Sequence, residues 1–284
     1  MTDPFSSAPD TARSLIETFA ACGVHLPEGQ GAVVLDLGAD ARCSAGMELA
    51  RTDFERVVGG LRLILRALDE PYGVIAAGAC FSEPFRLLRR LLSRGGNLKP
   101  LRYQPRPLED SRACLQRRLG AVRILSAELC RAAFRAVYEE ERFSDRLISV
   151  HFSGGCSYVR ARFGATCREI LQEVADYPTP ARIVVGDLYS GAAVSDVDAP
   201  LDDTADALQL LTARELPNPG PCIRCGICAR VCPEGVKPFK VAAGHKTDVS
   251  ACTLCGKCTY FCPARLPLAE RIAEEKQEVT ACAN

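Results

Sequence analysis

One cysteine motif occurs twice in the last quarter of this 284-residue chain, and no other feature restricts its fold as strongly. Both copies have the form C-x2-C-x2-C-x3-C-P; the first runs from Cys222 to Pro233 and the second from Cys252 to Pro263. Three closely spaced thiolates can wrap one corner of an iron–sulfur cube, while the fourth cysteine, past a turn, points away and binds the other cluster. The duplicated motif therefore predicts two [4Fe–4S] clusters.

The predicted ligand sets cross between the two motifs, because the last cysteine of each motif serves the cluster of the other. Gly226 and Gly256 are expected to leave space where the backbone approaches the sulfides. Pro233 and Pro263 redirect the chain after the fourth cysteine. The two predicted ligand sets are Cys222, Cys225, Cys228 and Cys262 for the first cluster, and Cys252, Cys255, Cys258 and Cys232 for the second.

The alternative explanation of these cysteines is a zinc-stapled scaffold, in which two zinc ions stabilise the fold and carry no electrons. Zinc takes four ligands, usually as two separated C-x2-C pairs. It explains neither the third cysteine of each motif nor the C-P ending. Iron and acid-labile sulfide, in a ratio close to one, distinguish the clusters from zinc.

The remaining composition is that of a folded protein in a reducing compartment. The 35 basic and 35 acidic residues balance, which argues against a nucleic-acid binder. The first residues have neither a basic start nor an apolar core, and no stretch of 18 apolar residues occurs, so we expect a cytoplasmic chain. Thiols stay reduced there or bind metal. The eight cysteines outside the motifs are expected to be buried, unreactive thiols: Cys22, Cys43, Cys80, Cys114, Cys130, Cys156, Cys167 and Cys282.

A Pro/Gly-rich stretch at 216–221 marks the start of the cysteine-rich part. Residues 1–145 alternate helix and strand signals, which predicts an α/β domain with a parallel or mixed sheet. Capping boxes at Ser7–Asp10 and Thr52–Glu55 are expected to begin two of its helices. Its remaining predicted elements are strands at 32–35 and 73–77, a helix at 54–68, and a helix from Ser82 that ends at Gly95–Gly96.

Residues 146–215 predict a small α+β domain, with strands at 147–152, 158–163 and 182–185 and a capped helix at 166–174. Residues 216–284 form the third predicted domain, where helices at 237–246 and 268–276 indicate a helical ferredoxin-type module. Such a module has no acid–base pair and no substrate pocket, so its expected use is one-electron relay. We assign no catalytic residue.

The cysteine-rich segment is basic before any metal is bound. From Cys222 to Arg265 it holds seven basic and two acidic residues. An oxidised cubane with four thiolates carries a charge of about −2, so two clusters nearly neutralise the segment. Each basic residue is equally well explained as a solvated surface side chain. The alternative is a surface for an acidic donor or acceptor such as a ferredoxin or flavodoxin.

From about Ala32 to Arg271, the chain resembles the C subunit of the Rnf-type electron transport complex and the related cobalamin-reductase flavoproteins of bacterial microcompartments. The resemblance is closest over Pro221–Cys228, Cys252–Cys258 and Cys262–Leu268. Residues 182–191 stand where the family has a Gly-rich turn. Residues 148–174 look like its soluble-ligand-binding β-grasp domain, and residues 54–76 look like part of its NADH/FMN module.

The resemblance implies an electron-transfer subunit that relays electrons through two [4Fe–4S] clusters with other subunits of a redox complex. It also implies a position on the cytoplasmic face of the inner membrane, held by those subunits. The family carries the loop G-x-G-G-x-G-F-P-T-x-x-K over its flavin and nucleotide. Residues 22–31 stand in its place without the glycine run, the F-P-T or the lysine. Phosphate-binding amides need such glycines, so the sequence argues against FMN and NAD(H). The alternative is a complete NADH- or ferredoxin-linked flavoenzyme rather than a relay subunit.

Overall fold

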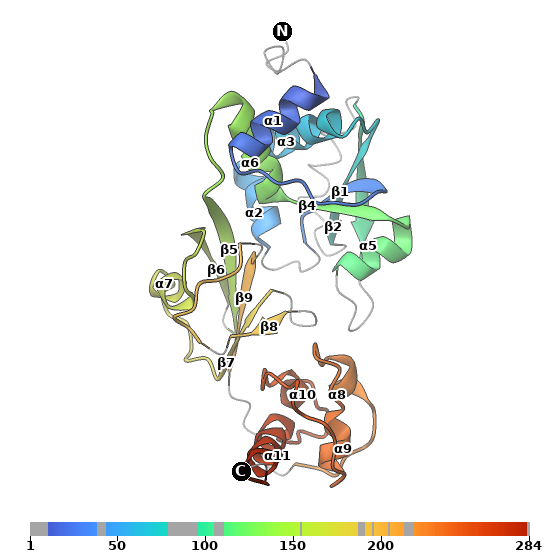
Figure 1. Ribbon diagram of the computed structural model, residues 1–284, viewed down its shortest axis with the longest axis vertical. Coiled ribbons are helices and arrows are strands. Elements are labelled where there is room, and N and C mark those ends of the chain that lie inside the picture. Colours follow the sequence, from blue (N-terminus) through green and yellow to red (C-terminus); the bar gives the residue numbers. More distant parts are fainter. Residues whose placement is uncertain are drawn as a thin grey trace. The chain divides into compact units, whose positions relative to one another are not determined.

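The computed structural model describes residues 11–38, 44–78, 96–104, 111–153, 155–186, 191–194, 196–203, 205–212 and 219–282 (Figure 1). The chain forms two compact units. One comprises Met1–Ser149 with Arg160–Phe163, and the other comprises Val150–Val159 with Gly164–Asn284. The predicted helix from Ser82 and the Ser7–Asp10 capping box lie outside the described residues.

The first unit contains a parallel sheet with the strand order β3-β2-β1-β4. Its central strand β1 pairs with β2 on one side and β4 on the other, and Val34 stands opposite both Val74 and Ile124. Every residue of β2 is buried, as expected for a parallel strand covered on both faces. The predicted parallel sheet is confirmed. Its strands are β1 (Ala32–Asp36), β2 (Gly73–Gly78), β3 (Leu98–Tyr103) and β4 (Val122–Ser126).

Helices α3 (Phe54–Ala67) and α6 (Ala127–Tyr138) cross closely in this unit. A Cβ atom at Gly60 would lie 1.6 Å from the carbonyl oxygen of Cys130, so only glycine permits the approach. The predicted Thr52–Glu55 capping box is wrong. Thr52 is the last residue of the preceding helix, and Asp53 stands at the N-cap of α3 with its carboxylate bound by Arg131 of α6. The other helices described here are α1 (Ala12–Ala21), α2 (Ala45–Thr52) and α5 (Ser111–Leu119).

A second sheet has five strands in the order β6-β5-β9-β7-β8. Strand β7 runs antiparallel to both β8 and β9. Thr166 and Glu169 form the predicted capping box of the short helix α7. Its elements are β5 (Asp145–Phe152), β6 (Gly155–Arg162), α7 (Cys167–Gln172), β7 (Arg182–Val185), β8 (Ala192–Ala193) and β9 (Ala207–Leu211).

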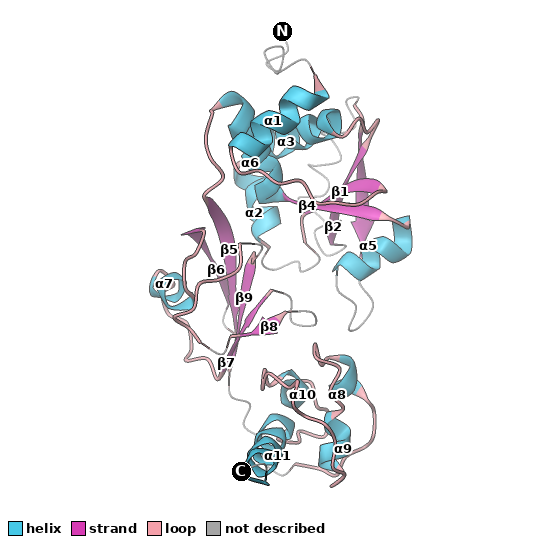
Figure 2. Cartoon of the chain, in the orientation of Figure 1, coloured by secondary structure: helices cyan, strands magenta, loops and turns pink. Residues whose placement is uncertain are grey.

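The cysteine-rich part, residues 219–282, contains helices and loops but no strand (Figure 2). The helix predicted at 237–246 is short, because the chain turns at Gly244, whose φ is 75°. The helix predicted at 268–276 continues to Cys282. No helix in the described ranges is both long and apolar enough to cross a membrane. The helices are α8 (Ile227–Arg230), α9 (Pro238–Ala242), α10 (Lys257–Tyr260) and α11 (Leu268–Cys282).

Candidate iron–sulfur centres

The two cysteine motifs share one backbone conformation. Between the first and second cysteines, Arg224 and Leu254 have φ values of 53° and 55°. Between the second and third, Gly226 and Gly256 have φ values of 73° and 74°. A positive φ is uncommon in residues other than glycine. Because it occurs at Arg224 and again 30 residues later at Leu254, the loop geometry is part of the repeat. Alternating left-handed residues curl each loop around its own cysteines.

Each loop ends in a helix of a single turn that carries the third cysteine. Gly226 and Gly256 are the N-cap residues of α8 and α10, and Cys228 and Cys258 are the second residues of those helices. A Cβ at Gly226 would meet no protein atom within 4 Å. The protein itself therefore needs glycine here for the left-handed backbone rather than for close packing.

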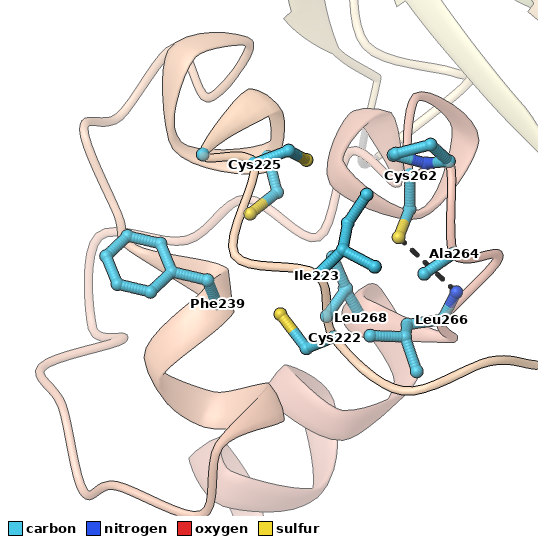
Figure 3. Close-up of a pocket in the computed structure, with 11 residues that line it drawn as sticks. Cys222, Ile223, Cys225, Phe239, Cys262, Ala264, Leu266 and Leu268 are labelled. Carbon is cyan, nitrogen blue, oxygen red and sulfur yellow. Dashed lines mark hydrogen bonds between the residues drawn. The ribbon is translucent and has the colours of Figure 1, made fainter.

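The first predicted ligand set lines one pocket, which both motifs build. Figure 3 shows Cys222, Cys225 and Cys262 around this pocket, and Cys262 comes from the second motif. The backbone N–H of Leu266 donates to the Cys262 sulfur at 3.4 Å. The rest of the wall is almost wholly apolar. The lining residues are Cys222, Ile223, Cys225, Gly226, Cys228, Phe239, Cys262, Pro263, Ala264, Leu266 and Leu268.

The second predicted ligand set also lies together. Burial is the main cause that raises the pKa of Cys258, to about 12, and the thiols of Cys255, Cys252 and Cys232 raise it further. Burial likewise raises the pKa of Cys252, with Cys232 and Cys255 adding to the shift. Both shifts include a contribution from Cys232, which places this thiol of the first motif near Cys252 and Cys258 of the second.

Backbone amides point at the sulfurs as well. Burial raises the pKa of Cys228, against hydrogen bonds from the amides of Phe239 and Ala229 that favour its thiolate. The amide of Leu254 donates to the Cys252 sulfur at 3.4 Å. Iron must displace the protons of these thiols when it binds. The amides then stabilise the negative charge that the thiolates and the cluster share.

The donor set suits a cluster better than a single ion. In the part of the chain that the structure describes, no three His, Cys, Asp or Glu side chains converge closely enough to hold one metal ion. The thiols instead surround a space, with backbone N–H groups among them. Sulfur donors spread round an apolar cavity fit a [4Fe–4S] cube, whose four irons each take one thiolate.

The other cysteines have separate surroundings. Cys114, Cys130 and Cys167 are buried as expected, and burial raises the pKa of Cys167 to about 11. Cys22 is only half-buried. Cys156 is disulfide-bonded, so the expectation of a free thiol there is wrong. The remaining three lie outside the described side chains: Cys43, Cys80 and Cys282.

The loop at 22–31, which stands in place of the family's glycine-rich loop, packs against the parallel sheet. A Cβ at Gly31 would lie 2.1 Å from the carbonyl oxygen of Ala121, beside the first residue of β1. The carbonyl of Gly29 accepts a hydrogen bond from Arg123. This is the amino edge of a parallel sheet, whereas nucleotides bind at the carboxyl edge. The loop therefore lies at the edge opposite to the one where nucleotides bind in such sheets.

Two basic residues that sequence reasoning missed hold the second motif in place. Of the two explanations left open for the basic residues, a solvated surface position is wrong for Lys257, whose side chain is 0% exposed and whose ammonium donates to the carbonyl of Gly191. Arg182 of β7 donates in return to the carbonyl of Leu254 at 3.0 Å. The G-K-C order in the second motif, where the first has G-I-C, was the sequence signal that could have singled out Lys257.

Known proteins with similar sequences support the assignment of the two cysteine motifs to iron–sulfur clusters. Residues 215–263 match the family model described as a 4Fe-4S dicluster domain. The C subunit of the ion-translocating oxidoreductase complex of Pseudomonas aeruginosa is 29% identical over 227 residues, which cover 69% of this chain and 28% of that protein. The corresponding protein of Rhodobacter capsulatus is 30% identical over 121 residues, 39% of this chain and 23% of that protein. The predicted resemblance to the C subunit is confirmed, although the match spans less than a third of each relative's length.

Solved structures share the fold at low sequence identity. The NAD+-reducing [NiFe]-hydrogenase in its H2-reduced state superposes with a TM-score of 0.54 at 11% identity, covering 99% of this chain and 63% of that chain. Its air-oxidized state gives a TM-score of 0.55, also at 11% identity, over 95% of this chain and 63% of that one. The likeness shows that this chain shares its mixed α/β fold with those structures.

Proposed function

We propose that this chain is an iron–sulfur electron-transfer subunit of a redox complex similar to the ion-translocating oxidoreductases. The proposal rests on one observation: each group of four cysteines includes one cysteine from the other motif. Four thiols from two motifs line one pocket, and Cys232 of the first motif adds to the raised pKa of Cys252 and Cys258 in the second. A match to a dicluster domain over the same residues supports it.

Each proposed ligand has a defined role. Cys222, Cys225 and Cys228 hold three corners of the first cluster and Cys262 the fourth; Cys252, Cys255 and Cys258 with Cys232 hold the second. A [4Fe–4S] cluster supplies reversible one-electron chemistry when it is bound. The protein excludes water with Phe239, Leu266 and Leu268 and directs amides at the sulfurs.

The remainder of the chain is proposed as the scaffold that attaches this relay to its complex. Residues 1–145 would be a degenerate NADH/FMN-type domain, 146–215 a β-grasp-like domain, and 216–284 the 2[4Fe–4S] domain. The parallel sheet and the hydrogenase-like fold support this division. The proposed partners are other subunits of the complex, with ferredoxin or flavodoxin as donor or acceptor, at the cytoplasmic face of the membrane.

A flavoenzyme that acts on NADH is the second candidate, and the fold shared with an NAD+-reducing hydrogenase favours it. The described residues fit it poorly. At the carboxyl edge of the parallel sheet, the carboxylate of Asp36 accepts hydrogen bonds from Tyr103 at 2.6 Å and from the amide of Gly38 at 2.9 Å. A carboxylate in that place repels the phosphate of a flavin or nucleotide.

Anaerobic purification followed by metal, sulfide and flavin analysis tests the proposal. About eight irons and eight sulfides per chain are expected, without stoichiometric FMN. Cys262→Ser should damage the cluster bound mainly by the first motif, and Cys232→Ser the cluster of the second, as seen by electron paramagnetic resonance. Cys167→Ser, at a buried cysteine outside the motifs, is the matched control and should keep both signals. Zinc without sulfide would contradict the relay, and bound FMN with NADH-driven cluster reduction would favour the flavoenzyme.

A further inference from the structure

The two cysteine motifs share a backbone but not an environment. Cys225 of the first motif is exposed, whereas Cys255, its equivalent in the second, is buried. Ile223 is 63% exposed, more than any other large apolar side chain found exposed in the described part of the chain. A Cβ at Gly226 would meet no neighbour within 4 Å, while one at Gly256 would lie 3.2 Å from the side chain of Arg182. The first motif faces solvent and the second is packed against protein.

The packing of the second motif is specific. Lys257 of α10 donates to the carbonyl of Gly191, which immediately precedes β8, and Arg182 of β7 donates to the carbonyl of Leu254 in the loop before α10. All these residues belong to the same compact unit. This reciprocal clamp covers the second motif with the chain's own sheet, so that side is closed to a partner.

Charge differs between the two sides in the same way. The segments 219–232 and 262–268, which supply the first pocket, carry three arginines and no acidic residue. Arg224, Arg230 and Arg265 are all exposed. The equivalent turn on the other side, 233–237, carries one exposed glutamate and one exposed lysine, which offset each other. The exposed side therefore presents three exposed arginines, whereas the two cations of the clamp, Lys257 and Arg182, donate to the carbonyls of Gly191 and Leu254.

We infer that the first cysteine motif and the turn after Cys262 form the docking face for an acidic one-electron redox protein. The inference rests on the proposed function. One electron leaves the reduced partner and reduces the cluster held by Cys222, Cys225, Cys228 and Cys262; no covalent bond forms or breaks. Exposed Ile223 and Pro263 supply the apolar centre of the face, and the arginines supply the charged rim that electron-transfer encounters use. A small face suffices, because such complexes are transient.

Stopped-flow mixing with reduced flavodoxin tests the inference, because the absorbance of its flavin is distinct from that of the clusters. The rate of cluster reduction should fall at least tenfold between about 10 mM and 150 mM salt, as the Debye length shrinks from about 30 to 8 Å. At low salt, Arg224→Glu combined with Arg265→Glu should slow the reaction about tenfold or more. The matched pair Lys237→Glu with Lys246→Glu, with the same change in charge, should slow it less than twofold.

A second pair of variants tests the apolar centre without a change in charge. Ile223→Asn should slow the reaction several-fold at both salt concentrations, since screening does not affect apolar contact. Thr253→Asn alters the exposed residue at the equivalent position of the second motif and should leave the rate unchanged. Equal slowing by both pairs, or a wild-type rate that ignores salt, would overturn the docking face, as would the absence of any reaction with flavodoxin.

The iron and sulfide content of each protein distinguishes failure of the proposed function from failure of the docking face. If the wild-type chain lacks iron and sulfide, the proposed function itself fails. If every variant keeps both clusters and dithionite reduces them, a rate change belongs to docking. Redox titration completes the test, because a loss of rate that a drop in cluster potential fully accounts for would also count against the docking face.

Discussion

The parallel sheet of the first unit and the cysteine module are held together by different interactions. The sheet buries long side chains from β1 and β2 under α3 and α6. In residues 219–282, α8 and α10 have four residues each and α9 has five, none with a side-chain cap, and α11 is longer with 15. The buried core of this part includes three of the proposed ligands: Cys228, Cys258 and Cys262. Isolated helices shorter than about 12–15 residues are marginal in water, so we expect the proposed clusters to stabilise this part of the chain as well as to carry electrons.

Removal of iron should have the largest effect and should separate the two regions. After anaerobic chelation, residues 219–267 should lose most of their protection from amide hydrogen exchange, because the core of the short helices includes ligand cysteines that metal no longer holds together. Amides in β1, β2 and α3 should keep theirs, since that core contains no ligand. Full protection of the module in the iron-free chain would contradict the comparison.

A substitution at Gly60 should destabilise the first unit and leave the cysteine-rich part unchanged. A Cβ there meets the main-chain oxygen of Cys130, which has little freedom to move, so Gly60→Ala should cost roughly 3 kcal/mol of unfolding free energy in the first unit. The control Gly220→Ala, where a Cβ meets nothing within 4 Å, should change stability by less than about 0.5 kcal/mol.

Urea unfolding followed by hydrogen exchange measures the first unit, and the cluster spectrum measures the second. Gly60→Ala should leave the cluster spectrum intact. Loss of the clusters in this variant would show that the two regions fold as one, and an unchanged unfolding midpoint would show that α3 and α6 can separate without cost.

Sequence patterns predicted the elements whose information is local. The helix expected at 54–68 is α3 (Phe54–Ala67), and the strand expected at 32–35 lies within β1. The left-handed residues between the cysteines, Arg224 and Leu254 among them, are not part of these predictions. Strand β9 was missed, because its pairing with β7 joins residues that are distant along the chain.

Long-range partners explain the other errors. The Thr52–Glu55 capping box failed because a side chain 78 residues away binds Asp53. Lys257 looked like a solvated lysine because its partner Gly191 is 66 residues away. Residue type at a single position does not reveal such partners, and they decide which of two equivalent motifs is open to solvent.

The smallest predicted effect concerns Asp53, where α2 meets α3. Burial alone would raise the pKa of this carboxyl, but hydrogen bonds from Arg131 at 2.7 Å and Arg56 at 3.1 Å outweigh it, so the pKa lies below its usual value. A lowered pKa adds stability above the unfolded value of about 3.9, and that stability is lost as the pH falls through the folded pKa. Asp53→Asn keeps the shape and removes the charge, so it should cost about 1 kcal/mol at pH 7.

The cost of Asp53→Asn should shrink toward zero as the pH falls from about 5 to below the folded pKa, because protonated wild type then resembles the variant. Hydrogen exchange of α3 and α6 in urea measures this difference in stability. Wild type and variant are compared at the same pH, because acid removes metal from both proteins equally. Glu17→Gln, at an exposed pair with Arg13 on α1, is the control and should show little effect at any pH. A constant difference between wild type and Asp53→Asn from pH 7 to pH 2 would mean that packing rather than charge holds α3 to α6 at this point, and the pair of Arg56 with Glu139 would be the next ion pair of α3 to test.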